Sequence, residues 1–405
     1  MSEAAVRREA PGRDVPDFSA LYDEIEQGAA RRERNRELPF DVVERLKQAG
    51  FGALRNTRVG QGGLTLRGLF AEVIRLGAAD ANVAHIFRNH YTIAEQHARN
   101  PRTEVGRRLH QAVAAGALIG LGYGELTDKA VGGAGSNLVT LLTPDSQGGY
   151  RLDGKKYYTT GTLYSDFVLV RAATAEGRPG SVVIPTKREG VQVIDDWDGA
   201  GQRLTASGTT IYDHVAVAGD EVVFDDQGIG YGLAYFNTQA QLFLTAVNAG
   251  IALGAFNDAR RLLLSRDRNF YHAPVAEPAR DPALHQVIGQ MAANAFAAEA
   301  TVLAAADALD RLAAIRDSGR DDPGLAHAAS LAAAKAKLVV DDLAIRNGSL
   351  IFEVGGASST KASHNFDRHW RNARTLANHN PDNYKAIAVG AHEVLGTPLP
   401  NAGFF

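Results

Sequence analysis

Three long alanine-rich segments dominate the C-terminal part of this 405-residue chain. They occupy residues 235–268, 282–318 and 323–351. Helices of this length bury their apolar stripes against one another in bundles. In residues 283–312 the small side chains are spread around the whole helix, so we expect neighbours on most sides, from the bundle or from another subunit. The pattern therefore predicts a C-terminal helical bundle and an oligomeric protein.

Helix start signals recur towards the N-terminus. Asp17 and Asp80 each precede a helical run, and Pro39 opens another. The first 16 residues are charged and carry few large apolar side chains, which favours a loose segment. We therefore expect a flexible arm at residues 1–16 and an α-helical domain at residues 17–115.

Glycine and β-branched residues become more frequent in the middle of the chain, where short apolar runs are separated by turn residues. Asp153 and Gly154 lie between two such runs and suit the positive φ of a tight hairpin turn. We therefore expect an antiparallel β-domain at residues 116–228 and a helical bundle domain at residues 229–405. The predicted fold class is α+β.

Charge and composition narrow the kinds of partner. The net charge of −3 gives no global field that would attract nucleic acid or an acidic membrane. The chain has no cysteine, and its 12 histidines are scattered, so no metal site is predicted. The N-terminus lacks an apolar signal core, and the small-apolar stretch 112–122 is too short to span a bilayer. We expect a cytoplasmic protein with a small-molecule partner.

Cations concentrate in DRHWRNARTLANHNP, residues 367–381. Helical geometry puts Arg371 and Arg374 on one face, where two guanidinium groups can hold one phosphate or carboxylate. A solvated basic face paired with Asp367 is the alternative. His379 stands alone just before a helix-breaking Asn-Pro pair. The segment is therefore a candidate functional site.

The α–β–α order resembles the acyl-CoA dehydrogenase fold, and three motifs agree with it. LDGKKYYTTGTLYSDFVLVRA resembles the stretch in which the backbone and a threonine meet the flavin ring. GAGQRLTASGTTIYDHVAV resembles the next β-domain segment, and GGASSTKASHNFDRHWRNART resembles the C-terminal block. The resemblance implies an N-terminal helical domain, a middle antiparallel β-domain and a C-terminal four-helix bundle.

The catalytic base of the dehydrogenases is missing from its usual place. Most members carry a carboxylate a few residues after a Gly-Gly pair, whereas Gly355 and Gly356 are followed by residues 357–365 without an acid. Some members carry the base elsewhere in the bundle. The strings DRHWRNART, DDWDGAGQRLTASGT and YKAIAVGAHEVLG instead resemble two-component flavin-dependent monooxygenases, typified by dibenzothiophene monooxygenase and the sulfur-acquisition oxidoreductases.

This second resemblance implies a set of partners. The cofactor would be reduced FMN, with FAD possible, supplied by a separate NAD(P)H:flavin reductase. Such enzymes add O2 to the flavin as a C4a-hydroperoxide, which needs a dry pocket with few, well-aimed hydrogen bonds. The implied substrate is a small apolar organosulfur compound or an aromatic heterocycle such as an indole. The implied assembly is a homotetramer.

The resemblance also assigns roles to single residues. Thr160 would place its hydroxyl near flavin N5, and His379 would lie over the flavin and meet the peroxide. His85 would stand at the substrate end of the pocket, on one helix face with Asn89. As residues alone, Thr160 also fits an ordinary strand position, and His379 also fits a structural histidine.

Two arginines are candidates for the flavin phosphate. Arg268 would reach the flavin of a neighbouring subunit, whereas Arg371 would either help on the same anion or brace Asp367. The remaining implied contacts are Tyr158, Thr159, Ser136 and Asn137 for the cofactor and Asn89 and Tyr123 for the substrate.

Three other functions remain open at the level of the sequence. A dehydrogenase acting on an acyl thioester would need a carboxylate base elsewhere in the bundle. An oxygenase acting on the nitrogen of an amine or amino sugar would need an acidic side chain to hold the ammonium. A helical binding protein that only retains the fold would bind no flavin.

Overall fold

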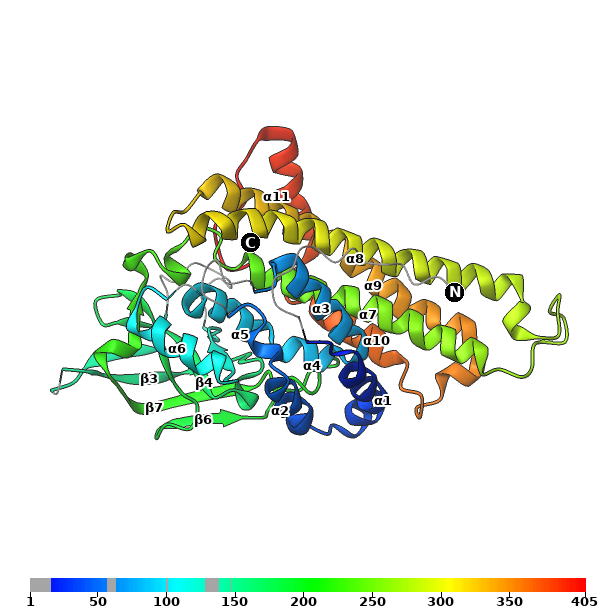
Figure 1. The fold of residues 1–405 in the computed structure, drawn as a ribbon, viewed down its shortest axis with the longest axis horizontal. Helices are drawn as coiled ribbons and strands as arrows, with labels where there is room; N and C mark the ends of the chain where they lie inside the picture. The colour runs from blue at the N-terminus through cyan, green and yellow to red at the C-terminus, as the bar shows by residue number, and fades with distance from the viewer. Residues whose placement is uncertain (1–15, 57–62, 100, 128–137, 147) are drawn as a thin grey trace.

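The protein is described by a computed structural model over residues 16–56, 63–99, 101–127, 138–146 and 148–405. Figure 1 shows a sheet at one end of the molecule and long helices that extend away from it. The short helices α4 and α5 lie between the sheet and the bundle. The largest apolar core joins the N-terminal helices to the bundle.

The N-terminal helices form where their start signals lie. The Asp80 carboxylate accepts the backbone N–H of Asn82 at 3.0 Å and that of Val83 at 3.4 Å, which caps the helix that follows. The elements are α1 (Ser19–Asn35), α2 (Phe40–Gln48), η1 (Phe51–Ala53), α3 (Leu66–Ala79), α4 (Ala81–Ile86), α5 (Arg88–Ile93), the π-helical turn η2 (Ala94–Ala98) and α6 (Glu104–Ala114).

The middle of the chain forms one eight-stranded sheet with the order β6-β7-β3-β2-β4-β5-β8, and β1 pairs with β4 off this path. Its strands and short helices are β1 (Ile119–Gly122), β2 (Leu141–Pro144), β3 (Tyr150–Lys156), η3 (Thr162–Tyr164), β4 (Phe167–Thr174), β5 (Pro179–Pro185), β6 (Val191–Ile194), β7 (Thr209–Val217), η4 (Gly219–Glu221), β8 (Val222–Phe224), η5 (Asp225–Gln227) and η6 (Gly230–Gly232).

The predicted antiparallel domain is in fact a mixed sheet. β1 and β2 both run parallel to β4, with Ile119 opposite Phe167 at the start of β4 and Leu141 opposite Ala173 near its end. Parallel pairing needs a long crossover, and β2 and β3 lie between β1 and β4 in the chain. Apolar alternation reports which face of a strand is buried and carries no information about strand direction, so the prediction was wrong on this point.

The predicted hairpin at Asp153 and Gly154 is also wrong. β3 runs through both residues, and its register with β7 shifts between Leu152 and Gly154. A Cβ at Gly154 would lie 2.5 Å from Oγ1 of Thr140, so the glycine permits a close approach within the sheet. The Asp153 carboxylate accepts the backbone N–H of His214 at 2.8 Å, beside the shift.

The bundle follows the three predicted long helices. α7, α8 and α9 pack against one another, α10 lies on α7 and α9, and α3 lies on α7 and α8. A Cβ at Gly250 would lie 2.6 Å from the carbonyl oxygen of Ile74, so a glycine allows α3 and α7 to approach closely. The elements are α7 (Thr238–Leu264), η7 (Pro278–Arg280), α8 (Pro282–Asp317), α9 (Pro323–Gly355), η8 (Gly356–Thr360), α10 (Asp367–Ala377) and α11 (Asp382–Leu395).

By length and composition alone, two of these helices are long and apolar enough to cross a membrane. They differ in how much of the most apolar window is buried inside the chain. In α7 the most apolar window is 89% buried, as expected for a core helix. In α8 only 28% of that window is buried within the chain, and Phe296 is among its exposed side chains. The alanine-rich surface of α8 is therefore largely uncovered in a single chain.

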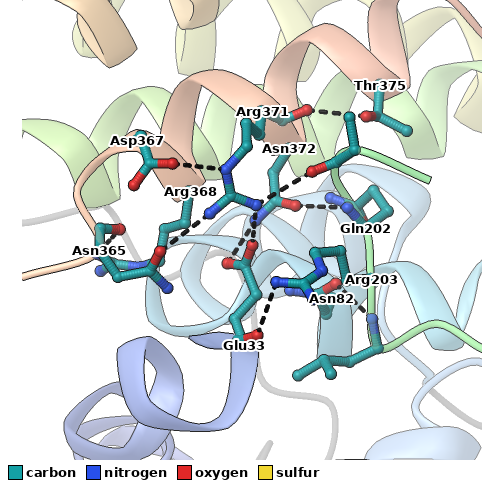
Figure 2. A network of polar contacts seen from close by, with 12 residues as sticks. Glu33, Asn82, Gln202, Arg203, Asn365, Asp367, Arg368, Arg371, Asn372 and Thr375 are labelled. Atoms are coloured by element: carbon teal, nitrogen blue, oxygen red, sulfur yellow. Dashed lines mark hydrogen bonds and ion pairs between the residues drawn. The ribbon is translucent and has the colours of Figure 1, made fainter. Parts of the chain in front are cut away.

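Glu33, near the end of α1, is the centre of a buried polar network (Figure 2). Its carboxylate accepts Nη1 of Arg371 at 2.5 Å and Nδ2 of Asn372 at 3.4 Å. Arg371 also donates to Asp367 at 2.7 Å and to Oδ1 of Asn365 at 2.9 Å. Burial raises the pKa of Glu33 despite the Arg371 guanidinium beside it. Arg371 is thus occupied within the fold and matches the bracing role considered for it.

The network also holds a loop of the β-domain against the helices. Oδ1 of Asn372 accepts the backbone N–H of Gln202 at 2.6 Å, and Oδ1 of Asn82 accepts that of Leu204 at 3.1 Å. Arg203 donates to a backbone carbonyl of α1 at 3.3 Å. Three consecutive residues of the β-domain are therefore bound to α10, α1 and α4.

We expect Arg371→Met to destabilise the protein strongly, because it leaves the Glu33 carboxylate buried without a cation. The free energy of unfolding, measured by urea denaturation, should fall by about 3–5 kcal/mol. The double variant Glu33→Met with Arg371→Met should recover much of this loss. The matched control is Arg374→Met, which removes an exposed arginine from the same helix. Equal losses for the two single arginine variants would contradict the expectation.

His97 predicts a pH dependence of stability. It is buried, neither ring nitrogen has a partner among the residues that the structure describes, and burial together with Arg171 lowers its pKa to about 4. Because the unfolded histidine has a pKa near 6.5, stability falls as pH drops from about 6.5 to 4. Relative to the wild type, His97→Leu should therefore gain about 1.4 kcal/mol of unfolding free energy between pH 7.5 and 5.5. A difference that does not change with pH would contradict this account.

Candidate active site

His85 lies on α4 and is held by the loop that the Glu33 network fixes. Its Nδ1 lies 3.1 Å from Oε1 of Gln202. Because an amide oxygen only accepts hydrogen bonds, the ring proton is on Nδ1 and Nε2 carries a lone pair. Nε2 is buried and has no partner among the described residues. Burial and the Arg88 guanidinium lower the pKa of His85 to about 3, so the ring is neutral.

Thr160 belongs to a chain of buried hydroxyl groups. Its Oγ1 lies 2.7 Å from Oγ of Ser207, which lies 2.7 Å from Oγ1 of Thr205. Asn89 of α5 donates to the backbone carbonyl of Thr160 at 2.9 Å. The amide of Asn89 therefore ties the His85 region to this segment of the β-domain. His85, Asn89 and Thr160, predicted from separate parts of the sequence, lie in one region.

Tyr158 and Thr159 point in different directions. Thr159 is fully buried and its hydroxyl lies 3.0 Å from the carbonyl of Gly208 and 2.9 Å from Oγ1 of Thr210, so it joins strands of the sheet. Tyr158 has a φ of 57° and is 62% exposed, and its ring meets Trp197 edge-on at 6.2 Å. Residues other than glycine rarely adopt this backbone conformation, and where they do the position is often part of a functional site.

His379 follows α10 and has no hydrogen-bond partner for its ring among the described residues. The residue is exposed in the single chain, and its ring meets Phe404 edge-on at 6.2 Å. Although the residue is exposed, desolvation of the ring by the chain around it, together with Arg88 and His85, holds its pKa well below the ordinary value, and Lys337 and Lys385 act in the same direction. His379 and His85 therefore share one cationic environment and are both neutral at neutral pH.

Tyr123 lies beside this region in an aromatic stack. Its ring is 5.5 Å from that of Tyr231, and Tyr231 is 4.6 Å from Phe236. The Arg171 guanidinium lies over the Tyr231 ring at 4.3 Å. Burial raises the pKa of Tyr231 above its ordinary value, although the Arg171 and Arg88 guanidinium groups act in the opposite direction. Tyr231 therefore stands between Tyr123 and the Arg88 side of the site.

Arg268 lies at the opposite end of α7 from His85. Arg88, three residues after His85, donates to the carbonyl of Ala240 near the start of α7. From there to the last residue of α7 is a helix length of roughly 36 Å, and Arg268 follows in an exposed loop. Within one chain Arg268 cannot reach the site, so a role there would require another subunit.

Two predicted cofactor contacts and one cluster of possible metal ligands lie apart from the residues around His85. Ser136 and Asn137 lie outside the described residues. Within the described part of the chain, Asp153, Asp213 and His214 place ligand atoms within 4.8 Å of one another, but all lie towards the surface and away from His85 in the sheet. Exposed acidic groups of this kind are common without an ion.

Four residues of the site were missed by reading the sequence. Gln202 and Ser207 lie in the quoted string GAGQRLTASGT, which was assigned to the β-domain without single contacts. Arg88 stands between His85 and Asn89, where a cation in an apolar helix is an unusual choice. Trp197 lies in DDWDGAGQ, and its indole donates to the carbonyl of Gln202 at 2.9 Å. Only the folded chain shows that these segments meet.

Comparison with known proteins agrees with this fold. Residues 242–383 match the family described as acyl-CoA dehydrogenase, C-terminal domain. Dibenzothiophene monooxygenase from Rhodococcus erythropolis is 30% identical over 351 residues, which cover 81% of both chains. The enzyme of the same name from Mycolicibacterium goodii is 36% identical over 278 residues, which cover 65% of each chain.

Solved structures extend the likeness to almost the whole chain. FMN-bound TdsC from Paenibacillus sp. A11-2 matches with a TM-score of 0.83 at 26% identity, covering 95% of this chain and 98% of that one. Methanesulfinate monooxygenase MsuC from Pseudomonas fluorescens matches with a TM-score of 0.82 at 26% identity and the same coverage. The predicted fold and family are thereby confirmed. The chain belongs to the dibenzothiophene monooxygenase family of flavin-dependent monooxygenases, which have the acyl-CoA dehydrogenase fold.

Proposed function

We propose that this protein uses reduced FMN and O2 to oxygenate a small organosulfur or heteroaromatic compound. Its relatives support this proposal by name: they include dibenzothiophene monooxygenases and a probable FMNH2-dependent monooxygenase of Pseudomonas putida, 31% identical over 244 residues. TdsC has been solved with FMN and indole together.

The residues of the site fit a flavin and a second small molecule. Tyr158 and Trp197 offer aromatic faces at the edge of the β-domain, and Thr160 offers a hydroxyl that Ser207 orients. Reduced FMN would supply the two electrons that activate O2. His85 presents an unpaired Nε2 as an acceptor. The neutral His379 can give or take a hydrogen bond without bringing a charge.

The positive charge of the site favours this function over a dehydrogenase and over an oxygenase that acts on amines. The strongest charges acting on the two histidines are cationic: Arg88 lowers the pKa of both His85 and His379, and Lys337 and Lys385 also lower that of His379. A dehydrogenase would need a carboxylate to abstract the α-proton of its substrate. An oxygenase for amines would need an acid to hold the ammonium, and a nearby arginine repels it instead.

The proposal includes the partners and the assembly. A separate NAD(P)H:flavin reductase would supply reduced FMN in the cytoplasm. A homotetramer would cover the exposed alanine-rich surface of α8, which a single chain leaves open. It would also bring Arg268 of one subunit to the flavin phosphate of the next. Within one chain, the length of α7 separates Arg268 from the site too far for this contact.

Rapid mixing of the protein and chemically reduced FMN with aerated buffer tests the chemistry. We expect flavin reoxidation, followed by absorbance, to be slower with the protein than without it. Thr160→Ala and His379→Asn should each speed it by about tenfold, the effect of losing one hydrogen bond to the reacting flavin. The control is His285→Asn, which changes an exposed histidine on α8. Flavin reduction by acyl-CoA compounds would contradict the proposal.

Subunit complementation tests the assembly. Arg268→Ala and His379→Asn should each reduce oxygenase activity, and hybrids formed by co-expressing the two variants should recover part of it. Recovery is expected because some sites in a hybrid then combine an intact Arg268 from one subunit with an intact His379 from another. Hybrids no more active than the two variants mixed after purification, or a monomer by light scattering, would contradict the shared site.

A further inference from the structure

Arg88 is unlike every other buried arginine in the described part of the chain. The only hydrogen bond of its side chain to a described residue runs from Nε to the carbonyl oxygen of Ala240 at 3.0 Å. Its two Nη atoms bond to no described residue, and no carboxylate forms an ion pair with it. The other buried arginines have carboxylates within 3.0 Å: Arg32 with Asp80, Arg55 with Glu95, Arg171 with Asp225 and Arg368 with Asp258.

An unpaired buried cation is costly, by several kcal/mol in a folded protein. Burial lowers the pKa of Arg88 to about 10, which still leaves the guanidinium charged at neutral pH. The nearby Tyr231 does not neutralise it, because burial raises the pKa of that phenol above its ordinary value and keeps it uncharged. The fold pairs each of the four other buried arginines with a carboxylate. The charge of Arg88 is therefore available to a group outside the described residues.

The unpaired guanidinium faces the site. Arg88 begins α5, three residues after His85 of α4 and directly before Asn89, which bonds to the carbonyl of Thr160. Its charge acts on both His85 and His379. Arg88 is 9% exposed, and its two Nη atoms are not fully enclosed although they have no described partner. The head group is therefore in contact with accessible space.

We propose that Arg88 binds the anionic head group of the substrate, so that the substrate is a small sulfinate rather than a neutral thiophene. This inference rests on the proposed oxygenase function. A planar guanidinium can hold two oxygens of one oxyanion at once. Among organosulfur acids, a sulfinate combines such an anion with a sulfur lone pair that can still be oxidised, whereas a sulfonate has none.

The reaction balances with the components of the proposed function. A sulfinate, O2 and FMNH2 would give a sulfonate, FMN and water. One oxygen atom forms a bond to sulfur, and the other leaves as water with two protons. Sulfur and the reduced flavin each lose two electrons, and O2 takes up all four. Arg88 would hold both sulfinate oxygens and thereby fix the direction of the sulfur lone pair.

Ligand binding to the FMN-bound protein tests this inference. The probes are benzenesulfinate and its neutral analogue methyl phenyl sulfoxide, measured by changes in flavin absorbance. We expect Arg88→Met to weaken benzenesulfinate binding by about 100-fold, as for loss of one partner of a buried charge pair. Sulfoxide binding should change by less than threefold. Arg260→Met, which removes an exposed arginine from α7, should change neither.

Thermal unfolding separates binding from a structural role. Without ligand, Arg88→Met should be at least as stable as the wild type, because it removes an unpaired buried charge. Benzenesulfinate should raise the Tm of the wild type and leave that of Arg88→Met unchanged. If Arg88→Met fails to fold, Arg88→Lys keeps the charge without the fork and should bind benzenesulfinate more weakly than the wild type. Equal affinity of wild type and Arg88→Lys would then overturn the proposal.

Reduced flavin is a second possible anion, and the same proteins distinguish it. If Arg88→Met binds reduced FMN more weakly but benzenesulfinate as tightly as the wild type, the charge serves the flavin and the substrate assignment is wrong. If the wild type slows flavin reoxidation but prefers the sulfoxide, the oxygenase function stands and the sulfinate assignment fails. If the wild type binds no FMN, the proposed function fails, and benzenesulfinate titration without FMN still decides the role of Arg88.

Discussion

The buried ion pair between Glu33 and Arg371 joins the three parts of the chain that build the site. A carboxylate inside a protein needs a cation and further donors, and Arg371 and Asn372 of α10 provide them. Asn372 also holds the backbone of Gln202, whose side chain sets the ring proton of His85. The charge pair and the contact from Asn372 to Gln202 are shown in Figure 2. The loop that orients His85 is therefore held by a charge pair that lies outside the site.

The site itself combines burial with an excess of positive charge. Burial and Arg88 lower the pKa of His85, and desolvation of the ring together with Arg88 lowers that of His379, so both rings are neutral at neutral pH. Neutral rings provide directed hydrogen bonds, and Arg88, Lys337 and Lys385 provide positive charge around them. Such an arrangement suits a reaction in which reduced flavin meets O2 away from bulk water and carboxylate bases.

Much of the fold was predictable because its signals are local. The long helices follow from alanine-rich length, and Asp80 caps a helix as its side chain predicts. Strand direction was not predictable, because apolar alternation is the same in parallel and antiparallel pairs. Asp153 and Gly154 fit a hairpin turn equally well as a shift of register inside β3, and only the packing of Thr140 against Gly154 distinguishes the two.

The sequence by itself determined the order of helices and strands, the resemblance to flavin-dependent monooxygenases, and the choice of His85, Asn89, Thr160 and His379, since each rests on a short run of residues. Only the tertiary structure decided that Arg371 is bound by Glu33, that Arg268 lies a helix length from its own site, and that Arg88 has no carboxylate partner in the described part of the chain. A charge is paired or unpaired according to groups that are distant in the chain, so local sequence cannot report it.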